Sequence, residues 1–222
     1  MTPFQDRLDT AMRLELAFIK TFNELCDSYK IVQYGIESTK LMDAHDFIRS
    51  CRDDTSRFVR YIPDSVLVHT KHPTVCNTTL VEFKAATTGV QKKEFMEYLS
   101  RHCPNMQPPF NSKDDIFNIE NDALELYLKL QSIGVRIIVV AYAGYRTNDD
   151  QIRAQFVEHI ARCNVYDPNQ QGQNTGSGTP IANVNFASFV PLTQFFREEF
   201  GIDDQVVNCV YENVQKEFNH VI

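Results

Sequence analysis

The sequence predicts an α/β (α+β) protein with a mixed central sheet flanked by helices. Residues 135–142 are predicted to form a strand buried on both faces, because an unbroken apolar run covers residues 137–143. An amphipathic segment precedes this run and ends at Gly134, the glycine expected just after a helix. Two shorter apolar runs, around Val66 and Leu80, are separated by turn residues. Helix, glycine and strand in this order indicate a crossover in a mixed sheet.

Amphipathic spacing predicts helices over much of the remaining chain, because apolar residues recur every three or four positions with charged residues between them. The first such helix spans residues 3–29, and its carboxylates Glu15 and Glu24 are expected on the solvated face. The other predicted helices cover residues 41–51, 91–102, 119–132, 149–163, 193–200 and 203–218.

Further strands are expected where short apolar runs are bounded by turn residues. The expected strands cover residues 58–61, 66–69, 79–86, 135–142 and 184–190. Residues 167–182 are rich in Gln, Asn, Gly and Pro, so a long exposed loop is expected there.

Length and composition favour one domain. The chain has 222 residues, 43% of them hydrophobic and 23% charged, which suits a single folded unit with a real core. The predicted organisation is a helical lobe at about 1–55 and closing helices at 193–222, both packed on a core at 56–190.

Charge and cysteine usage limit the possible partners. The formal net charge of -7 argues against tight, self-sufficient nucleic-acid binding, but a nuclease whose carboxylates bind divalent metal is compatible with it. The longest apolar run is too short to span a bilayer, so no membrane partner is expected. Six scattered cysteines and no secretory signal pattern favour reduced thiols and a cytoplasmic location.

The residues with the clearest chemical meaning lie on two successive predicted strands. Asp64 follows Pro63 at the start of one strand, and Glu82-Phe83-Lys84 lies in the next. Residues two apart on a strand project to the same face, so Glu82 and Lys84 are expected together and Phe83 is expected to face the core. Carboxylates and the Phe83 carbonyl are hard oxygen ligands suited to Mg²⁺ or Mn²⁺.

Lys84 completes the chemistry of this pattern. A lysine ammonium beside metal-bound water can position that water or neutralise charge that develops at phosphorus. Asp64, Glu82 and Lys84 are therefore the predicted catalytic residues of a metal-dependent phosphodiester hydrolase. Lys92 and Lys93 follow on the next predicted helix and are candidates for contacts with substrate phosphates, although a solvated helix face is an equal alternative.

Pro63-Asp64 combined with Glu82-Phe83-Lys84 resembles the signature of the PD-(D/E)xK nuclease superfamily. The resemblance covers most of the chain. It implies a restriction-endonuclease-like core in which a mixed sheet is flanked by helices. It also implies two divalent ions at the scissile phosphate, both bound by Asp64.

The segment Leu41-Met-Asp-Ala-His45-Asp46-Phe47 is similar to the His-Asp helix of the cap-snatching endonucleases at the N-terminus of bunyavirus L proteins, which are RNA-dependent RNA polymerases. This resemblance implies His45 as a nitrogen ligand that favours Mn²⁺ over Mg²⁺. It also implies a further acid after His45, which could be Asp53, Asp54 or Asp46. Glu82, the Phe83 carbonyl and His45 would then bind one ion, with Asp53 or Asp54 supporting the other.

The expected function is a Mn²⁺- or Mg²⁺-dependent RNA endonuclease. The resemblance implies capped host mRNA as substrate, priming of viral transcription as purpose, and the rest of a viral polymerase as partner. Two alternatives stay open: a DNA endonuclease of the same fold, of restriction or repair type, and a non-catalytic interaction domain. A zinc site at His69, His72 and Cys76 is not expected, because a fourth ligand is missing and the spacing fits no common site.

Overall fold

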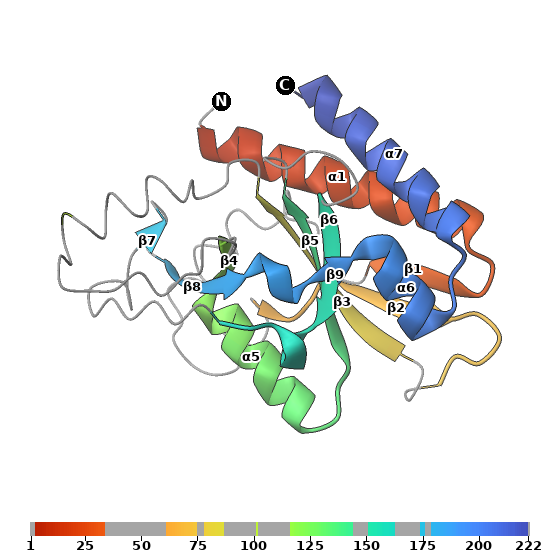
Figure 1. Ribbon diagram of the computed structural model, residues 1–222, viewed down its shortest axis with the longest axis horizontal. Coiled ribbons are helices and arrows are strands. Elements are labelled where there is room, and N and C mark those ends of the chain that lie inside the picture. Colours follow the sequence, from red (N-terminus) through yellow and green to blue (C-terminus); the bar gives the residue numbers. More distant parts are fainter. Residues whose placement is uncertain are drawn as a thin grey trace.

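The computed structural model describes residues 3–33, 61–74, 78–86, 101, 116–143, 151–162, 174–175 and 179–221. Within these residues the chain forms a six-stranded mixed sheet of order β1-β2-β3-β5-β6-β9, with helices against its faces (Figure 1). A smaller sheet of order β4-β8-β7 lies to one side. The predicted fold class, a mixed sheet flanked by helices, is confirmed.

The centre of the large sheet is the parallel pair β3 (Thr78–Ala86) and β5 (Ile137–Ala143). Every residue of β5 is buried, as the unbroken apolar run predicted. Helix α5 (Asn121–Ser132) precedes β5. Gly134 follows this helix with φ of 93°, a left-handed conformation that favours glycine, and its N–H donates to the Gln131 carbonyl. The predicted helix–glycine–strand order is therefore correct.

The outer strands of the large sheet all pair in antiparallel fashion. On one side of the centre lie β2 (Ser65–His69) and then β1 (Tyr29–Gln33); on the other lie β6 (Ile152–Phe156) and then β9 (Val190–Pro191). The parallel pair thus sits between antiparallel hairpin-like partners, which makes the sheet mixed.

Two hydrophobic cores cover the opposite faces of this sheet. One face packs against α1 (Pro3–Leu25), α6 (Leu192–Phe200) and α7 (Asp204–Val221), and α1 and α7 run side by side in Figure 1. The other face packs against α5 and the smaller sheet, which contains β4 (Ile116–Glu120), β7 (Asn174–Thr175) and β8 (Thr179–Asn185). Alternate residues of β5 enter alternate cores.

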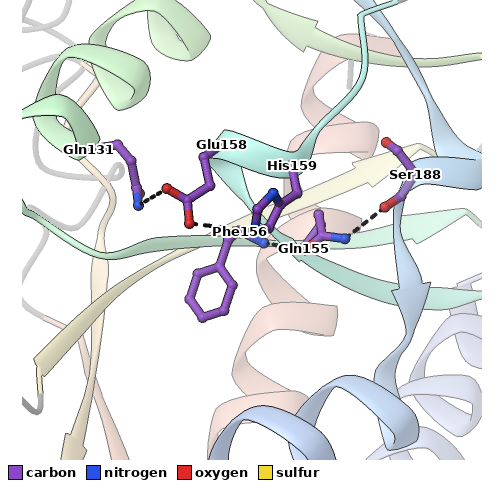
Figure 2. Close-up of polar contacts among 6 residues, drawn as sticks. All are labelled: Gln131, Gln155, Phe156, Glu158, His159 and Ser188. Atoms are coloured by element: carbon purple, nitrogen blue, oxygen red, sulfur yellow. Dashed lines mark hydrogen bonds and ion pairs between the residues drawn. The ribbon is translucent and has the colours of Figure 1, made fainter.

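The helix predicted over residues 149–163 is wrong, because this segment contains strand β6 and the short 3-10 helix η3 (Val157–His159). Buried and half-buried residues alternate along β6, which is the period of a strand packed on one face. Side chains of β6 and η3 form hydrogen bonds with two neighbouring segments, as Figure 2 shows. Gln131 of α5 donates to Glu158 at 2.7 Å, and Gln155 of β6 donates to the Ser188 carbonyl at 2.8 Å.

Several predicted boundaries also need correction. The first helix ends at Leu25, and Tyr29 already belongs to β1. The helix predicted at 119–132 begins at Asn121, after β4. Tyr61, predicted as strand, is helical. The loop predicted at 167–182 contains β7 and the start of β8, and the strand predicted at 184–190 is interrupted by the 3-10 helix η4 (Phe186–Ser188). Pairing between β4 and β8 supplies these strands with partners that local sequence does not reveal.

Among the described residues, no helix combines the length and the apolar character that crossing a membrane requires.

Strand β1 is an edge of the large sheet, and helix α1 covers part of that edge. The Asn23 side chain donates to the Ile31 carbonyl at 2.8 Å and accepts from the Ile31 N–H at 2.7 Å. Lys30 in turn donates to the Asn23 carbonyl of α1 and, at 2.7 Å, to the carbonyl of Cys26 just after the helix. The side-chain amide of Asn23 therefore takes the place of a neighbouring strand. It satisfies the Ile31 N–H and carbonyl, which could otherwise pair with a strand of another chain.

We predict that Asn23→Ala lowers the free energy of unfolding by about 1–3 kcal/mol, because it leaves both backbone groups of Ile31 without their partner. Urea unfolding followed by circular dichroism measures the change. Asn208→Ala is the matched control, since Asn208 is exposed on α7 and its loss should cost less than about 0.5 kcal/mol. Equal stability of the two variants would show that this contact does not stabilise the edge.

Candidate active site

Asp64 and Glu82 are brought together by the register of β2 on β3. Ser65 pairs with Val81, so one further step along the antiparallel pair sets Asp64 opposite Glu82. Opposite residues in an antiparallel pair project to the same side of the sheet. The expected convergence of these two carboxylates is consistent with this register, and charge interaction between them contributes to the pKa of Glu82.

Glu82 and Lys84 form an ion pair on the face of β3 that packs against α5. The Lys84 Nζ lies 2.7 Å from Glu82 Oε1, and their side chains are 24% and 10% exposed. Their neighbours on β5 are Val139 and Ala141. The expectation that Glu82 and Lys84 share one face is therefore confirmed.

Phe83 projects to the opposite face, as expected. Its ring packs edge-on against Phe18 of α1, with 5.1 Å between ring centroids. This contact anchors the middle of the Glu82-Phe83-Lys84 triplet in the core, and the residues on either side are directed away from α1. The role of the Phe83 carbonyl as a metal ligand stays a prediction.

A further carboxylate enters this site from α1. Glu15 was expected on a solvated helix face, and that expectation is wrong: its side chain is half-buried, accepts a 3.0 Å hydrogen bond from Gln33 and is electrostatically coupled to Asp64 and Glu82. Gln33 ends β1 and pairs with Ser65, which directly follows Asp64. Docking of α1 against the sheet brings Glu15 within electrostatic range of Asp64, Glu82 and Lys84.

Two more residues reach the site from the β4–α5 segment. Glu120, the last residue of β4, lies 3.8 Å from the Lys84 ammonium. Tyr127, on α5, is 1% exposed and hydrogen-bonds through its hydroxyl to Glu82. Neither residue stood out in the sequence, because a lone glutamate before a helix and a tyrosine on an apolar helical face carry no pattern of their own.

Burial dominates the electrostatics of the carboxylates. It raises the pKa of Glu82, and attraction to Lys84 opposes that rise only in part. The pKa of Asp64 is also raised by loss of surrounding water, although its side chain retains solvent exposure. For Glu15, burial and the nearby negative charges raise the pKa from 4.5 to about 7. The site therefore holds carboxylates that resist ionisation together.

Lys84, unlike the carboxylates, is held in its charged form. Burial alone would lower the pKa of its ammonium, but the surrounding negative charge, led by Glu82 and Glu120, outweighs burial and holds that pKa above its usual value. Lys84 is accordingly a fixed positive charge at neutral pH and not a proton acceptor. Tyr127 is also kept neutral, because burial and the charge of Glu82 raise its pKa.

The carboxylates of Glu15, Asp64 and Glu82 are the kind of group that binds a hard divalent cation, and Glu120 adds charge beside Lys84. Four carboxylates, from Glu15, Asp64, Glu82 and Glu120, interact with one ammonium, so ionising all of them leaves an excess of negative charge. Oxygen ligands of this kind suit Mg²⁺ or Mn²⁺. Within the part of the chain that the structure describes, no three or more His, Cys, Asp or Glu side chains are already grouped as a metal site.

The remaining predicted site residues lie outside the described residues. They are His45, Asp46, Asp53, Asp54, Lys92 and Lys93. Of the residues considered for zinc, His69 and His72 are described and Cys76 is not. The Nδ1 of His69 accepts hydrogen bonds from the N–H groups of Lys71 and His72 at 3.1 and 3.2 Å.

Comparison with known proteins found no matching family model and no matching curated protein.

The raised pKa of Glu15 predicts a pH dependence of stability. The folded protein retains a proton on Glu15 that the unfolded chain has lost, so the free energy of unfolding should fall as pH rises from 4.5 to about 7. Glu15→Gln removes this titration and should make the fall in the free energy of unfolding shallower. The remaining fall comes from Asp64 and Glu82, whose pKa values are also raised. Thermal unfolding in EDTA across this pH range measures the slope.

Glu24→Gln is the matched control, because Glu24 lies on the same helix with its side chain exposed. It should keep the parental pH profile. If Glu15→Gln also keeps that profile, Glu15 does not share the electrostatic field of the site.

Proposed function

We propose that this chain is an endonuclease that uses Mn²⁺ or Mg²⁺ to hydrolyse phosphodiester bonds. The observation that carries the proposal is the Lys84 ammonium held 2.7 Å from Glu82 on a central strand, within electrostatic range of Asp64 and Glu15. A fixed positive charge among carboxylates of raised pKa is an arrangement that stability alone does not favour. It supports a site built for a divalent cation and a phosphate.

Asp64, Glu82 and Glu15 are the described residues that would hold the metal, with the Phe83 carbonyl as a further oxygen ligand. His45 and Asp53 or Asp54 are proposed to complete the ligand set, as the resemblance implies. When bound, the metal supplies Lewis-acid stabilisation of the phosphate and a more acidic bound water. The chain's own groups orient the phosphate and balance charge around it.

Lys84 is proposed to stabilise charge during the reaction. Its pKa is held above the usual value, so it keeps its proton at neutral pH and does not act as a general base. An ammonium in this position can donate a hydrogen bond to the attacking water or to a phosphate oxygen as negative charge grows there. Because Lys84 is only 24% exposed, little water competes for that interaction.

RNA is the proposed substrate. Binding to nucleic acid requires basic side chains that neutralise phosphates, and this chain has a net charge of -7. The charge therefore supports a nuclease module that relies on a larger protein for binding the nucleic acid. The resemblance of the segment around His45 to cap-snatching endonucleases supports capped mRNA as the RNA and the rest of a viral polymerase as that larger protein. Lys92 and Lys93 remain proposed phosphate contacts.

Metal binding is tested by thermal unfolding with and without Mn²⁺. The parental protein should melt at a higher temperature in Mn²⁺, because a ligand at about 100 times its Kd adds about 2.7 kcal/mol to the free energy of unfolding. Asp64→Asn and Glu82→Gln should remove this increase. Glu199→Gln, at an exposed position of α6, should keep it. No Mn²⁺ effect on the parental protein, together with no cleavage, would favour a non-catalytic interaction domain.

The role of Lys84 is tested with Lys84→Met, which keeps the aliphatic stem and removes the charge. This variant should retain the Mn²⁺-dependent increase in melting temperature and lose about 100- to 1,000-fold in kcat, the usual cost of removing one group that stabilises transition-state charge. Lys20→Met, on the exposed side of α1, is the control and should cleave normally. Cleavage by Lys84→Met at the parental rate would disprove the role given to this lysine.

The substrate class is tested by incubating the parental protein with single-stranded RNA and with duplex DNA of the same sequence in Mn²⁺. We expect cleavage of the RNA to be faster, with EDTA abolishing it. Faster cleavage of duplex DNA would assign the chain to DNA metabolism and would leave the metal site and the role of Lys84 unchanged.

A further inference from the structure

Helix α5 presents two polar groups to the Lys84–Glu82 pair. Glu120 occupies the N-cap position of the helix and Tyr127 lies seven residues further, which is close to two full helical turns. Residues at this spacing share one helical face, and here that face packs against the large sheet. One rigid element therefore delivers both side chains to the same ion pair.

Glu120 is not used as a helix cap. Ser, Thr, Asp and Asn are preferred at this position, because their side chains accept from the free N–H groups of the first turn. The Glu120 side chain makes no such bond, and its carboxylate instead lies 3.8 Å from the Lys84 ammonium. At 40% exposure, it can move without disturbing the core.

Tyr127 contacts the other member of the ion pair, Glu82. Its ring packs in the core between α5 and the sheet, and its hydroxyl hydrogen-bonds to the nearly buried Glu82 carboxylate. A carboxylate oxygen accepts, so the Tyr127 hydroxyl is the donor in this hydrogen bond. Glu82 thus has donors on two sides, the Lys84 ammonium and the Tyr127 hydroxyl.

We propose that α5 positions the catalytic ion pair, with Tyr127 orienting the Glu82 carboxylate and Glu120 orienting the Lys84 ammonium. This inference rests on the proposed function. When Glu82 binds a cation, its attraction for Lys84 weakens, and Glu120 offers the ammonium a second partner that keeps it near the reacting phosphate. The Tyr127 hydroxyl meanwhile fixes the direction of the Glu82 oxygens, as groups behind metal ligands commonly do.

The first test compares Tyr127→Phe with the parental protein by calorimetric titration of Mn²⁺ and by steady-state cleavage. Removing only the hydroxyl should raise the Mn²⁺ dissociation constant about 10- to 100-fold. Tyr142→Phe is the matched control: Tyr142 is buried on the same sheet, but it belongs to the core on the opposite face. Its Mn²⁺ affinity should equal that of the parental protein.

The second test uses Glu120→Gln, a partly exposed position at which the variant keeps its shape and loses its charge. Its Mn²⁺ affinity and its KM should be unchanged, while kcat falls about 10-fold, because the altered group holds Lys84 and touches neither metal nor substrate. A purely structural role would leave kcat unchanged. This variant also keeps the proposal testable if Tyr127→Phe fails to fold.

The possible failures are distinct. If the parental protein neither binds Mn²⁺ nor cleaves RNA or DNA, the proposed function fails, and this inference fails with it. If the parental protein binds and cleaves, but Tyr127→Phe keeps its Mn²⁺ affinity or Tyr142→Phe loses it equally, the positioning role of Tyr127 is wrong and the proposed function stands. Weaker Mn²⁺ binding by Glu120→Gln would make Glu120 a metal ligand and overturn its role as the partner of Lys84.

Discussion

The structure of the site depends on the 2.7 Å ion pair between Lys84 and Glu82. Removing two charges from water costs several kcal/mol for each ion, and their mutual attraction recovers only part of that cost. A well-packed apolar pair on this central strand would serve the fold equally well. The pair persists beside Asp64, Glu15 and Glu120, which add further negative charge and raise the cost. Such a concentration of charge is typical of a functional site.

Side chains of β3 alternate between the two faces of the sheet, so burial of the ion pair leaves the apolar core on the other face intact. Val81 and Phe83 enter the core beneath α1, while Glu82 and Lys84 project to the α5 side. The apolar residues thus anchor the strand from behind while the polar ones face the site. Because the apolar and the charged side chains of β3 lie on opposite faces, the ion pair does not interrupt the hydrophobic core against α1.

The erroneous helix prediction at 149–163 has a clear physical origin. In this segment small and polar residues separate the apolar ones, so short windows fit both the helical and the strand period. Pairing with the fully buried β5 decides the conformation, since Ile152, Ala154 and Phe156 all point into one core. Strand β8 was missed for a related reason: its polar residues are stabilised by pairing with β4, a segment far away in the sequence.

The sequence by itself determined the mixed α/β class, the buried strand β5, and the shared face of Glu82 and Lys84, because these follow from periodicity within a few residues. Only the tertiary structure decided that Glu15, Glu120 and Tyr127 join them. Glu15 matches the pattern of a solvated helix face, and it interacts with the site only because α1 docks on the sheet with Glu15 beside Gln33. Contacts between distant elements depend on how those elements pack, and local periodicity carries no information about that packing.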